Sequence, residues 1–342
     1  MNKPNIIFPA EWAEQSGVML TWPHEGTDWA DILDEVEGCF IAIARAIAER
    51  EKLLIVCQNP ELLKDKLTNC HLENIVFAVY PLNDTWARDH GAITVLIDEK
   101  PTLYDFTFNG WGMKFAANFD NQITSSLYRN DFFRRDVHYE NKQHLVLEGG
   151  SLESDGEGTL LTTRECLLSI NRNQHLKEGE IEKQLTDLFG LHQVLWLSSG
   201  YLAGDDTDSH IDTLARFCDP QTIAYVKCED ANDEHYKALK LMEQELNLFR
   251  TLNNEPYHLI PLPMADAVYD GKQRLPATYA NFLIINEAVL IPSYNSPKDT
   301  IAAQQLKNAF PGREIIGIDC SVLIKQHGSL HCVTMQFPKG VL

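Results

Sequence analysis

Residues 281–319, NFLIINEAVLIPSYNSPKDTIAAQQLKNAFPGREIIGID, hold the pattern that decides the fold. Two apolar runs flank a short polar turn in residues 281–294, which is typical of a β-hairpin. Residues 298–310 follow as a helical stretch, and residues 314–319 form one further apolar run. This part of the chain therefore predicts two strands, a helix and another strand.

The same order recurs about five times along the chain, although the letters of the units differ. We expect the other helices at residues 31–50, 121–135, 177–190 and 233–250, and strands after them at residues 53–57, 144–148, 193–197 and 257–263. No linker, low-complexity stretch or shift in composition divides the chain. The sequence predicts one α/β domain over residues 1–342, built of repeated units around a centre, and the alternative is a doubly wound sheet.

The chain is acidic, with 29 lysine and arginine residues against 49 aspartate and glutamate residues and a formal net charge of -20. Such a charge argues against nucleic acid and against an anionic membrane as partners. It favours a cationic substrate, although acidity that only keeps the protein soluble explains the charge equally well.

We expect a cytoplasmic protein with reduced thiols. No stretch has the length and apolar character of a signal peptide or a membrane span. The eight cysteines are scattered without a C-x-x-C pair, and a chain of 342 residues does not need a disulfide framework.

The segment GDDTDSHID, residues 204–212, is the richest cluster of polar side chains. Residues 210–219 read as a strand, so we expect Asp208, His210 and Asp212 to face the same way, because side chains alternate along a strand. An acidic loop with a solvated histidine is the plainer interpretation. Histidine and aspartate also bind metals, but the zinc spacings such as H-E-x-x-H are absent, so we predict no metal site.

Three further clusters lie at strand ends or in short connections, where functional residues are usually placed. In LEGGS, residues 147–151, Glu148 ends an apolar strand, and the two glycines after it allow a ligand to approach the backbone. NDTWARDHG, residues 83–91, gathers acids, an arginine and a tryptophan. FNGWGMKF, residues 108–115, surrounds a tryptophan with glycines. Each cluster is a weak signal when it is taken alone.

Cys332 differs from the other seven cysteines because a Gly-Ser loop, in QHGSLHC, delivers it to the start of a predicted strand. Most cysteines are small buried apolar residues, and the other seven fit that role. On a strand His331 points away from the face of Cys332, so we expect the distant His210 to be its acid/base partner.

One thiol, one histidine and several carboxylates, without a nucleotide loop or a metal motif, favour a substrate with a planar cation. A papain-like hydrolase does not need the additional acids, whereas a guanidinium has five N–H groups that carboxylates hold bidentately. We expect the Cys332 thiolate to attack the guanidinium carbon while His210 protonates the departing nitrogen. His210 then activates a water molecule that releases a urea-type product.

These residues lie in motifs that resemble the agmatine deiminase and bacterial-type peptidylarginine deiminase family, which belongs to the guanidino-group-modifying enzymes. The matching stretches cover essentially the whole chain: PAEWAEQSGVMLTWP, TWARD, FNGWG, VLEGGSLESDGEGTLLTT, NRN, GDDTDSHID, AFPGREIIGI and GSLHC. The resemblance implies a five-bladed, pseudo-symmetric α/β propeller of ββαβ units with the site at its centre. It implies no cofactor, and a homodimer is a further expectation from it.

The resemblance also implies roles for single residues. Cys332 is the nucleophile, His210 is the general acid and base, and Glu148 holds the guanidinium or orients His210. Asp89 and Asp212 grip the guanidinium nitrogens.

Three more residues match the family at the substrate site. Asp206 corresponds to an acid that we expect near the distal amine of the substrate. Trp86 and Trp111 correspond to tryptophans that we expect to form walls around its aliphatic arm.

The chain departs from the family pattern at two places. The usual Asp-Thr-Asn-Gly-His run is here Asp206-Thr207-Asp208-Ser209-His210, and the glycine-rich stretch before the final His-Cys carries Gln326, His327 and Ser329. These departures affect the expected substrate more than the chemistry. The predicted function is agmatine deiminase, which forms N-carbamoylputrescine and ammonia for polyamine synthesis. The alternatives are a deiminase of peptidylarginine or of an arginine derivative, a non-catalytic guanidine-binding protein and a metal hydrolase.

Overall fold

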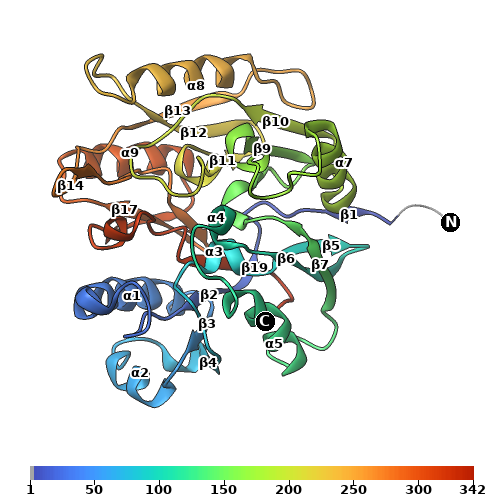
Figure 1. Cartoon of the computed structure of the whole chain (residues 1–342), viewed down its shortest axis with the longest axis vertical. Helices are drawn as coiled ribbons and strands as arrows, with labels where there is room; N and C mark the ends of the chain where they lie inside the picture. The colour runs from blue at the N-terminus through green and yellow to red at the C-terminus, as the bar shows by residue number, and fades with distance from the viewer. Residues whose placement is uncertain (1–3) are drawn as a thin grey trace.

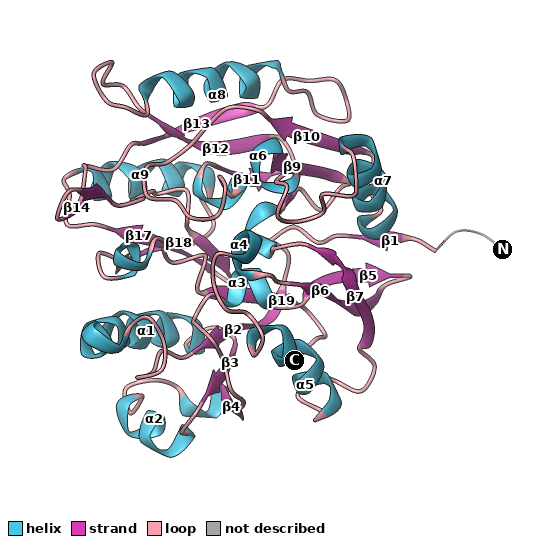
Figure 2. Ribbon diagram, in the orientation of Figure 1, coloured by secondary structure: helices cyan, strands magenta, loops and turns pink. Residues whose placement is uncertain are grey.

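Helices and strands alternate along the whole of residues 4–342, the range that the computed structural model describes. The described strands form five sheets of three or four strands and one small two-stranded sheet. In each of the five larger sheets an antiparallel pair is followed by a parallel pair, and a helix connects the two parallel strands. The protein therefore has a mixed α/β fold (Figures 1 and 2).

The first two of these sheets contain the N-terminal part of the chain. One is formed by β19 (Thr334–Pro338), β2 (Gln15–Thr21), β3 (Lys52–Cys57) and β4 (Ile75–Val79), with helices α1 (Leu33–Ala48) and α2 (Pro60–Lys66) in its connections. The other is formed by β1 (Ile6–Ile7), β5 (Ile93–Ile97), β6 (Lys100–Thr107) and β7 (His138–Val146), with α5 (Asp120–Arg129) between β6 and β7.

The other three large sheets have three strands each. They comprise β8 (Glu153–Ser154), β9 (Thr159–Thr163) and β10 (Gln193–Leu197) with α7 (Glu178–Phe189); β11 (Ala215–Asp219), β12 (Thr222–Lys227) and β13 (His258–Pro263) with α8 (Tyr236–Leu248); and β16 (Leu283–Ile285), β17 (Ala288–Ser293) and β18 (Glu314–Asp319) with α9 (Lys298–Ala309). The small hairpin β14 (Tyr269–Asp270) and β15 (Gln273–Arg274) lies apart from them in the strand order.

Local sequence explains the ends of several elements. Asn59 begins α2 by accepting hydrogen bonds from the amides of Glu61 and Leu62, and Pro60 occupies the first turn, where no amide donor is needed. Gly190 ends α7 in the left-handed region with a φ of +67°. The tight turn between β16 and β17 places Glu287 at a φ of +64°.

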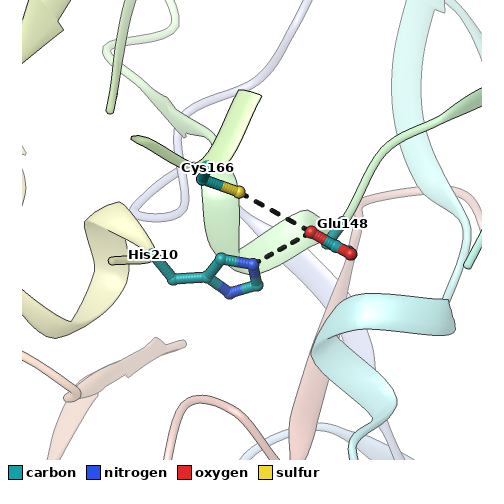
Figure 3. Close-up of side chains that lie close together, drawn as sticks. All are labelled: Glu148, Cys166 and His210. Atoms are coloured by element: carbon teal, nitrogen blue, oxygen red, sulfur yellow. Dashed lines mark hydrogen bonds and ion pairs between the residues drawn. The ribbon is translucent and has the colours of Figure 1, made fainter. Parts of the chain in front are cut away.

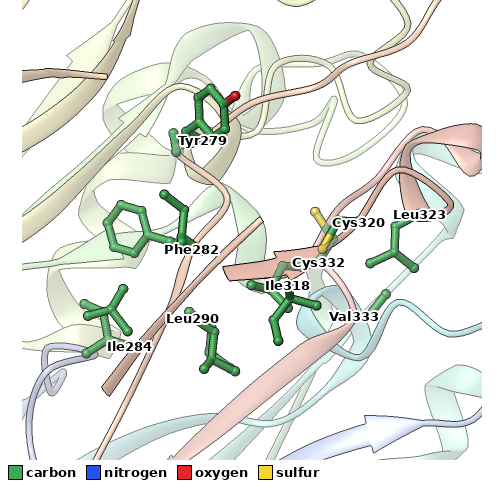
Figure 4. Packing of buried hydrophobic residues seen from close by; sticks show 14 of the residues in the cluster. Tyr279, Phe282, Ile284, Leu290, Ile318, Cys320, Leu323, Cys332 and Val333 are labelled. Carbon is green, nitrogen blue, oxygen red and sulfur yellow. The ribbon is translucent and has the colours of Figure 1, made fainter. Parts of the chain in front are cut away.

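The apolar faces pack into two buried clusters, and the larger one joins α1, α8 and α9 to the sheets beside them. Figure 4 shows part of this cluster, in which Leu290 comes from β17, Ile318 comes from β18, and Phe282 directly precedes β16. Cys332 and Cys320 lie among these apolar side chains. The cluster therefore places a thiol at the border between the core and a cavity described below.

Most predicted elements form, and the differences lie where polar residues interrupt a pattern. The helix expected at 121–135 ends at Arg129, and Asp131 has a φ of +57°, which no α-helix contains. The strand expected at 144–148 forms as β7, which begins earlier, at His138, and ends two residues earlier, at Val146. The strand predicted over 210–219 is wrong in its first half, because residues 211–213 form a 3-10 turn and only β11 is extended. The alternative of a doubly wound sheet is also wrong, because the described strands divide among separate sheets.

Figure 1 shows the connecting helices α1, α5, α7, α8 and α9 toward the outside, while the short α3 (Ala87–His90) and α4 (Gly110–Met113) lie near the middle of the view. Among the described residues, no helix has the length and apolar character needed to cross a bilayer.

Candidate active site

Short turns rather than strands carry the predicted site residues. Asp89 lies in α3, and Glu148 directly precedes the 3-10 turn at 149–151. His210 directly precedes a second 3-10 turn, at 211–213, and Asp212 lies within it. Cys332 lies in the turn just before β19. All five side chains are buried.

Gly150 marks the point where three of these side chains meet. A Cβ atom added there would lie 2.5 Å from His210 Nδ1, 2.8 Å from an Asp89 oxygen and 3.2 Å from an Asp212 oxygen. Only glycine fits at this position, because the Cβ of any other residue would displace the imidazole and both carboxylates. This confirms that residues from three distant segments converge.

His210 is held by Glu148 (Figure 3), and Glu148 is in turn held by Arg172. His210 Nε2 lies 3.1 Å from Glu148 Oε2, while Arg172 Nε lies 3.1 Å and 2.8 Å from the two Glu148 oxygens. The carboxylate and guanidinium groups of this pair are completely buried. Such a pair fixes the orientation of the imidazole because neither partner can turn without leaving a buried charge unpaired.

The surroundings of His210 favour its charged form. Burial alone lowers its pKa, but the nearby charge of Asp89 and the hydrogen bond to Glu148 outweigh burial and raise the pKa well above the usual value. Burial raises the pKa of Glu148 as well, and the interactions with His210 and Arg172 reverse this effect and lower it. His210 is thus suited to donate a proton while Glu148 stays ionised.

Cys332 is surrounded by acceptors. Its Sγ lies 3.4 Å from Asn281 Oδ1 and 3.9 Å from Asp212 Oδ2. Burial, followed by the charges of Asp212 and Asp89, raises the pKa of the thiol well above its usual value. A thiolate at this position therefore needs a positive charge beside it.

His331 was expected on a strand, pointing away from the face of Cys332; the strand is wrong at this position, and the ring contacts Asp212. Residues 331–333 form a turn rather than a strand, and the ring lies between two carboxylates. Its Nδ1 is 2.7 Å from Asp212 Oδ2, and its Nε2 is 2.7 Å from Glu11 Oε2. This contact leaves the other oxygen of Asp212, Oδ1, buried and without a hydrogen-bond partner among residues 4–342.

Asp89 is held at both oxygens. Its Oδ2 accepts a hydrogen bond of 2.9 Å from Trp111 Nε1, and its Oδ1 accepts one of 3.0 Å from the Gly150 amide. Burial raises the pKa of Asp89 to about 6, although His210 acts in the opposite direction. Asp89 Oδ1 also lies 3.6 Å from His210 Nδ1, which places this carboxylate between the histidine and Trp111.

A pocket opens above Cys332. Its lining comprises Asp28, Asp84, Trp86, Asp89, Trp111, Phe115, Asp206, Thr207, Gln326, His327, Gly328 and Cys332. Trp86 and Trp111 meet edge to face with ring centres 6.3 Å apart. The lining thus combines two aromatic walls with four aspartates and contains no lysine or arginine.

The structure brings all eight predicted site residues to this cavity or to the layer directly behind it. The prediction that Asp208, His210 and Asp212 share one face of a strand is wrong. Asp208 and Ser209 both have a φ of +63°, and the chain turns sharply there. As a result, Asp208 points to Arg172 and Lys114 instead of the cavity.

The departures near the C-terminus have different surroundings. Gln326 and His327 line the cavity, and His327 lies in the left-handed region with a φ of +68°. Ser329 is buried, and its Oγ lies 2.8 Å from the hydroxyl of Tyr294. Only the first two are therefore placed to touch a substrate in the cavity.

Glu148, Cys166 and His210 offer three atoms of metal-binding types within 4.8 Å of one another (Figure 3). Arg172 already donates to both oxygens of Glu148. A metal ion at this point would face a guanidinium and a histidine that holds its proton, so the cluster fits an acid/base centre better than a metal centre.

Sequence reasoning missed Arg172, Asn281 and Glu11. Arg172 supports Glu148, Glu11 binds His331, and Asn281 accepts hydrogen bonds from the His331 and Cys332 amides at 2.9 Å and 3.3 Å. Arg172 and Glu11 lie in the matching stretches NRN and PAEW, which were the only signal for them. Nothing in the local pattern around Asn281 indicates its contacts.

The model of the Porphyromonas-type peptidyl-arginine deiminase family matches residues 7–338. The chain belongs to this family. It is similar to a solved protein of Porphyromonas gingivalis, described provisionally as an arginine deiminase, with 55% identity, a TM-score of 0.96 and coverage of 98% of this chain and 99% of that one.

Two further relatives carry the description agmatine deiminase. A solved C. jejuni agmatine deiminase with a cysteine-to-serine substitution and bound substrate is 38% identical with a TM-score of 0.92, and the match covers 100% of this chain and 99% of that one. A Legionella pneumophila protein, so described provisionally, is 34% identical over 98% of this chain and 96% of its own length. The family is therefore one of hydrolases that act on carbon–nitrogen bonds.

Proposed function

We propose that this protein is an agmatine deiminase, which converts agmatine and water to N-carbamoylputrescine and ammonia. One observation carries the proposal: the buried side chains of Cys332 and His210 lie beside Asp89 and Asp212, and one oxygen of Asp212 has no protein partner among the described residues. Asp212 Oδ1 and His210 Nδ1 are both buried without a hydrogen-bond partner among the described residues. A buried polar atom without a partner is costly, and a guanidinium offers donors for the carboxylate.

In the proposed reaction, Asp89 and Asp212 hold the guanidinium nitrogens and Cys332 attacks the central carbon. His210 donates its proton to the departing nitrogen, and ammonia leaves. Glu148 keeps the imidazole in place during this transfer. The neutral His210 then takes a proton from water, the water oxygen attacks the same carbon, and the thiolate leaves as the urea-type product forms.

The substrate itself supplies the charge that the thiol needs. Two carboxylates and burial raise the pKa of Cys332, and a bound cation offsets both carboxylates at once. The thiol therefore loses its proton to solvent water when the guanidinium occupies the site, and the empty enzyme keeps a protonated thiol. This order protects the nucleophile from other electrophiles.

The cavity supports agmatine over free arginine. Asp28, Asp84 and Asp206 line its outer part, and no arginine or lysine is present to bind a carboxylate. Agmatine ends in an ammonium group, which these aspartates attract, whereas the carboxylate of arginine would be repelled. Trp86 and Trp111 pack against the aliphatic arm in this proposal.

A deiminase of peptidylarginine or of another arginine derivative is the second candidate, and the family description favours it. A peptide substrate presents no carboxylate beside its arginine, so the acidic lining does not exclude it. The test is a screen of ammonia release over agmatine, free arginine, methylated arginines and an arginine peptide. We expect agmatine to react with the highest kcat/KM, and a protein that releases ammonia from none of them contradicts the proposal.

We further propose that residues 1–342 form a single deiminase domain and that its five repeated sheets are arranged as a five-bladed propeller around the site. The resemblance to the family extends the proposal to a cytoplasmic enzyme of putrescine synthesis and to a homodimer. Light scattering on the purified protein tests the oligomeric state.

A further inference from the structure

Asp208 forms a second charged connection, besides that of Asp89, between the loop that carries Trp111 and the groups around His210. Its Oδ1 lies 2.8 Å from Lys114 Nζ, and its Oδ2 lies 2.6 Å from Arg172 NH1. The Asp208 side chain is about one-quarter exposed, the Arg172 side chain is fully buried, and Lys114 reaches solvent. One carboxylate therefore bridges a surface cation and an interior cation.

The backbone at this point is unfavourable for the residues that it holds. Asp208 and Ser209 follow one another in the left-handed region, each with a φ of +63°. Most side chains with a Cβ resist this conformation, glycine accepts it most readily, and asparagine and aspartate follow, so Ser209 is the less favourable of the two. The Ser209 amide donates to Asp205 Oδ2 at 2.7 Å, which holds the turn closed. The turn is kept despite its strain, and it aims the Asp208 carboxylate at both cations.

The Lys114 side of the bridge leads to the wall of the cavity. Lys114 follows the segment Gly110–Met113, in which all four residues have positive φ angles, including Trp111 at +53°. Lys114 Nζ also donates to the Asp206 carbonyl at 2.6 Å. The strained loop that carries Trp111 is thus fastened by Lys114 to the segment that carries Asp206 and Asp208.

The Arg172 side of the bridge leads to the proton donor. The Arg172 guanidinium also binds Glu148 through Nε, and its Nη2 donates a hydrogen bond of 2.9 Å to the Thr207 carbonyl. Glu148 in turn holds His210. A continuous series of charged contacts therefore runs from Lys114 through Asp208, Arg172 and Glu148 to the imidazole.

We propose that Asp208 is a positioning residue that ties the Trp111 loop to the Arg172–Glu148 support of His210. It touches no substrate in this role and acts through the two cations. The inference rests on the proposed function, because Trp111 and His210 take their meaning from that reaction. It explains why a charged residue occupies a left-handed position.

The variants Lys114→Met and Asp208→Asn separate the two halves of the bridge. Lys114→Met releases only the loop, so we expect KM for agmatine to rise about threefold to tenfold with little change in kcat, as for the loss of one partly exposed charged contact. Asp208→Asn also frees Arg172, so we expect kcat to fall in addition. The Lys114–Asp208 pair is open to solvent, so 0.5 M salt raises KM in the wild type and has less effect in Lys114→Met.

Lys298→Met is the matched control, because Lys298 forms a comparable ion pair of 3.0 Å with Asp266 away from the cavity and has a similar exposure of 38%. We expect its kinetic constants to stay within twofold of the wild type. If Asp208→Asn keeps both KM and kcat within twofold as well, the positioning role of Asp208 is refuted.

Amide hydrogen exchange tests the bridge even without a turnover assay. We expect faster exchange in residues 109–117 of Lys114→Met and Asp208→Asn than in the wild type or Lys298→Met. Unchanged exchange in both variants overturns the proposal. A wild type that releases no ammonia from any guanidino compound overturns the proposed function instead, and the exchange result then still decides whether the bridge holds the loop.

Discussion

The substitution Glu148→Gln removes the negative charge beside His210, the proposed proton donor, and leaves the shape of the side chain almost unchanged. Glu148 Oε2 lies 3.1 Å from His210 Nε2. At this distance two unit charges attract by about 5 kcal/mol with an effective dielectric constant of about 20, which is an upper limit. Neighbouring carboxylates in proteins shift a pKa by about 1–3 units. We therefore expect the pKa of His210 to fall by about 1–3 units in the variant.

Two effects act together in this variant. The attraction that raises the pKa of His210 is lost, and Arg172 keeps a positive charge that no longer has its Glu148 partner. Loss of one partner from a buried ion pair also lowers the free energy of unfolding by about 3–5 kcal/mol. The variant should therefore melt at a lower temperature and work over a more acidic range.

Ammonia release from agmatine measured between pH 5.5 and 10 tests this prediction. The alkaline limb of the kcat profile reports the loss of the protonated histidine, and we expect it to move to lower pH by about 1–3 units. Activity should partly recover in acid, which a merely misfolded protein does not do. Glu51→Gln is the control, because burial raises the pKa of Glu51 to about 7 and its carboxylate accepts from the Asn286 amide away from the site. A folded Glu148→Gln variant with an unmoved alkaline limb refutes the reasoning.

Three further outcomes are expected. Cys332→Ser should lower ammonia release by a factor of about 10³ or more without lowering the melting temperature, whereas the control Cys57→Ser should stay active. Substantial turnover by Cys332→Ser rules out Cys332 as the nucleophile. Asp206→Asn should raise KM for agmatine about tenfold and leave it unchanged for a guanidine with an uncharged far end; equal effects on both compounds contradict a role in binding the ammonium group. Burial raises the pKa of the Asp120 carboxyl to about 7, although the Asn83 amide acts in the opposite direction. The protonated carboxyl therefore stabilises the fold at acidic pH, and this contribution to the free energy of unfolding is lost as pH rises through about 7. The melting temperature should therefore fall less steeply with rising pH between pH 5 and 8 in Asp120→Asn than in the wild type. Parallel curves for the two proteins rule out a contribution of Asp120 to the pH dependence of stability.

Helices and apolar strands were predictable from the sequence because one buried face imposes a regular spacing. The predicted helix at 298–310 is α9, Lys298–Ala309, and the hairpin before it forms with its turn at the expected place. Cys332 and Glu148 were also expected at the ends of apolar runs, and both lie in short turns next to strands. In these cases local pattern and tertiary burial agree.

The parts that the sequence did not predict depend on polar groups that meet across long distances. The strand assigned to Asp208, His210 and Asp212 failed because two left-handed residues turn the chain, and an alternating polar pattern does not reveal this. The ring of His331 was assigned away from the site because the strand was assumed to begin two or three residues too early. Arg172 lies 24 residues from its partner Glu148, and no periodicity links the two positions.

The pairing of β19 with β2 has a consequence for the making of the protein. Thr334 pairs with Leu20, so the turn that holds Cys332 is fixed only when the end of the described chain returns to a strand near its beginning. A nascent polypeptide can fold its other sheets during translation, but Cys332, the proposed nucleophile, is not held in place until β19 has been synthesised and docked. Products that end before β19 are consequently expected to release no ammonia from agmatine.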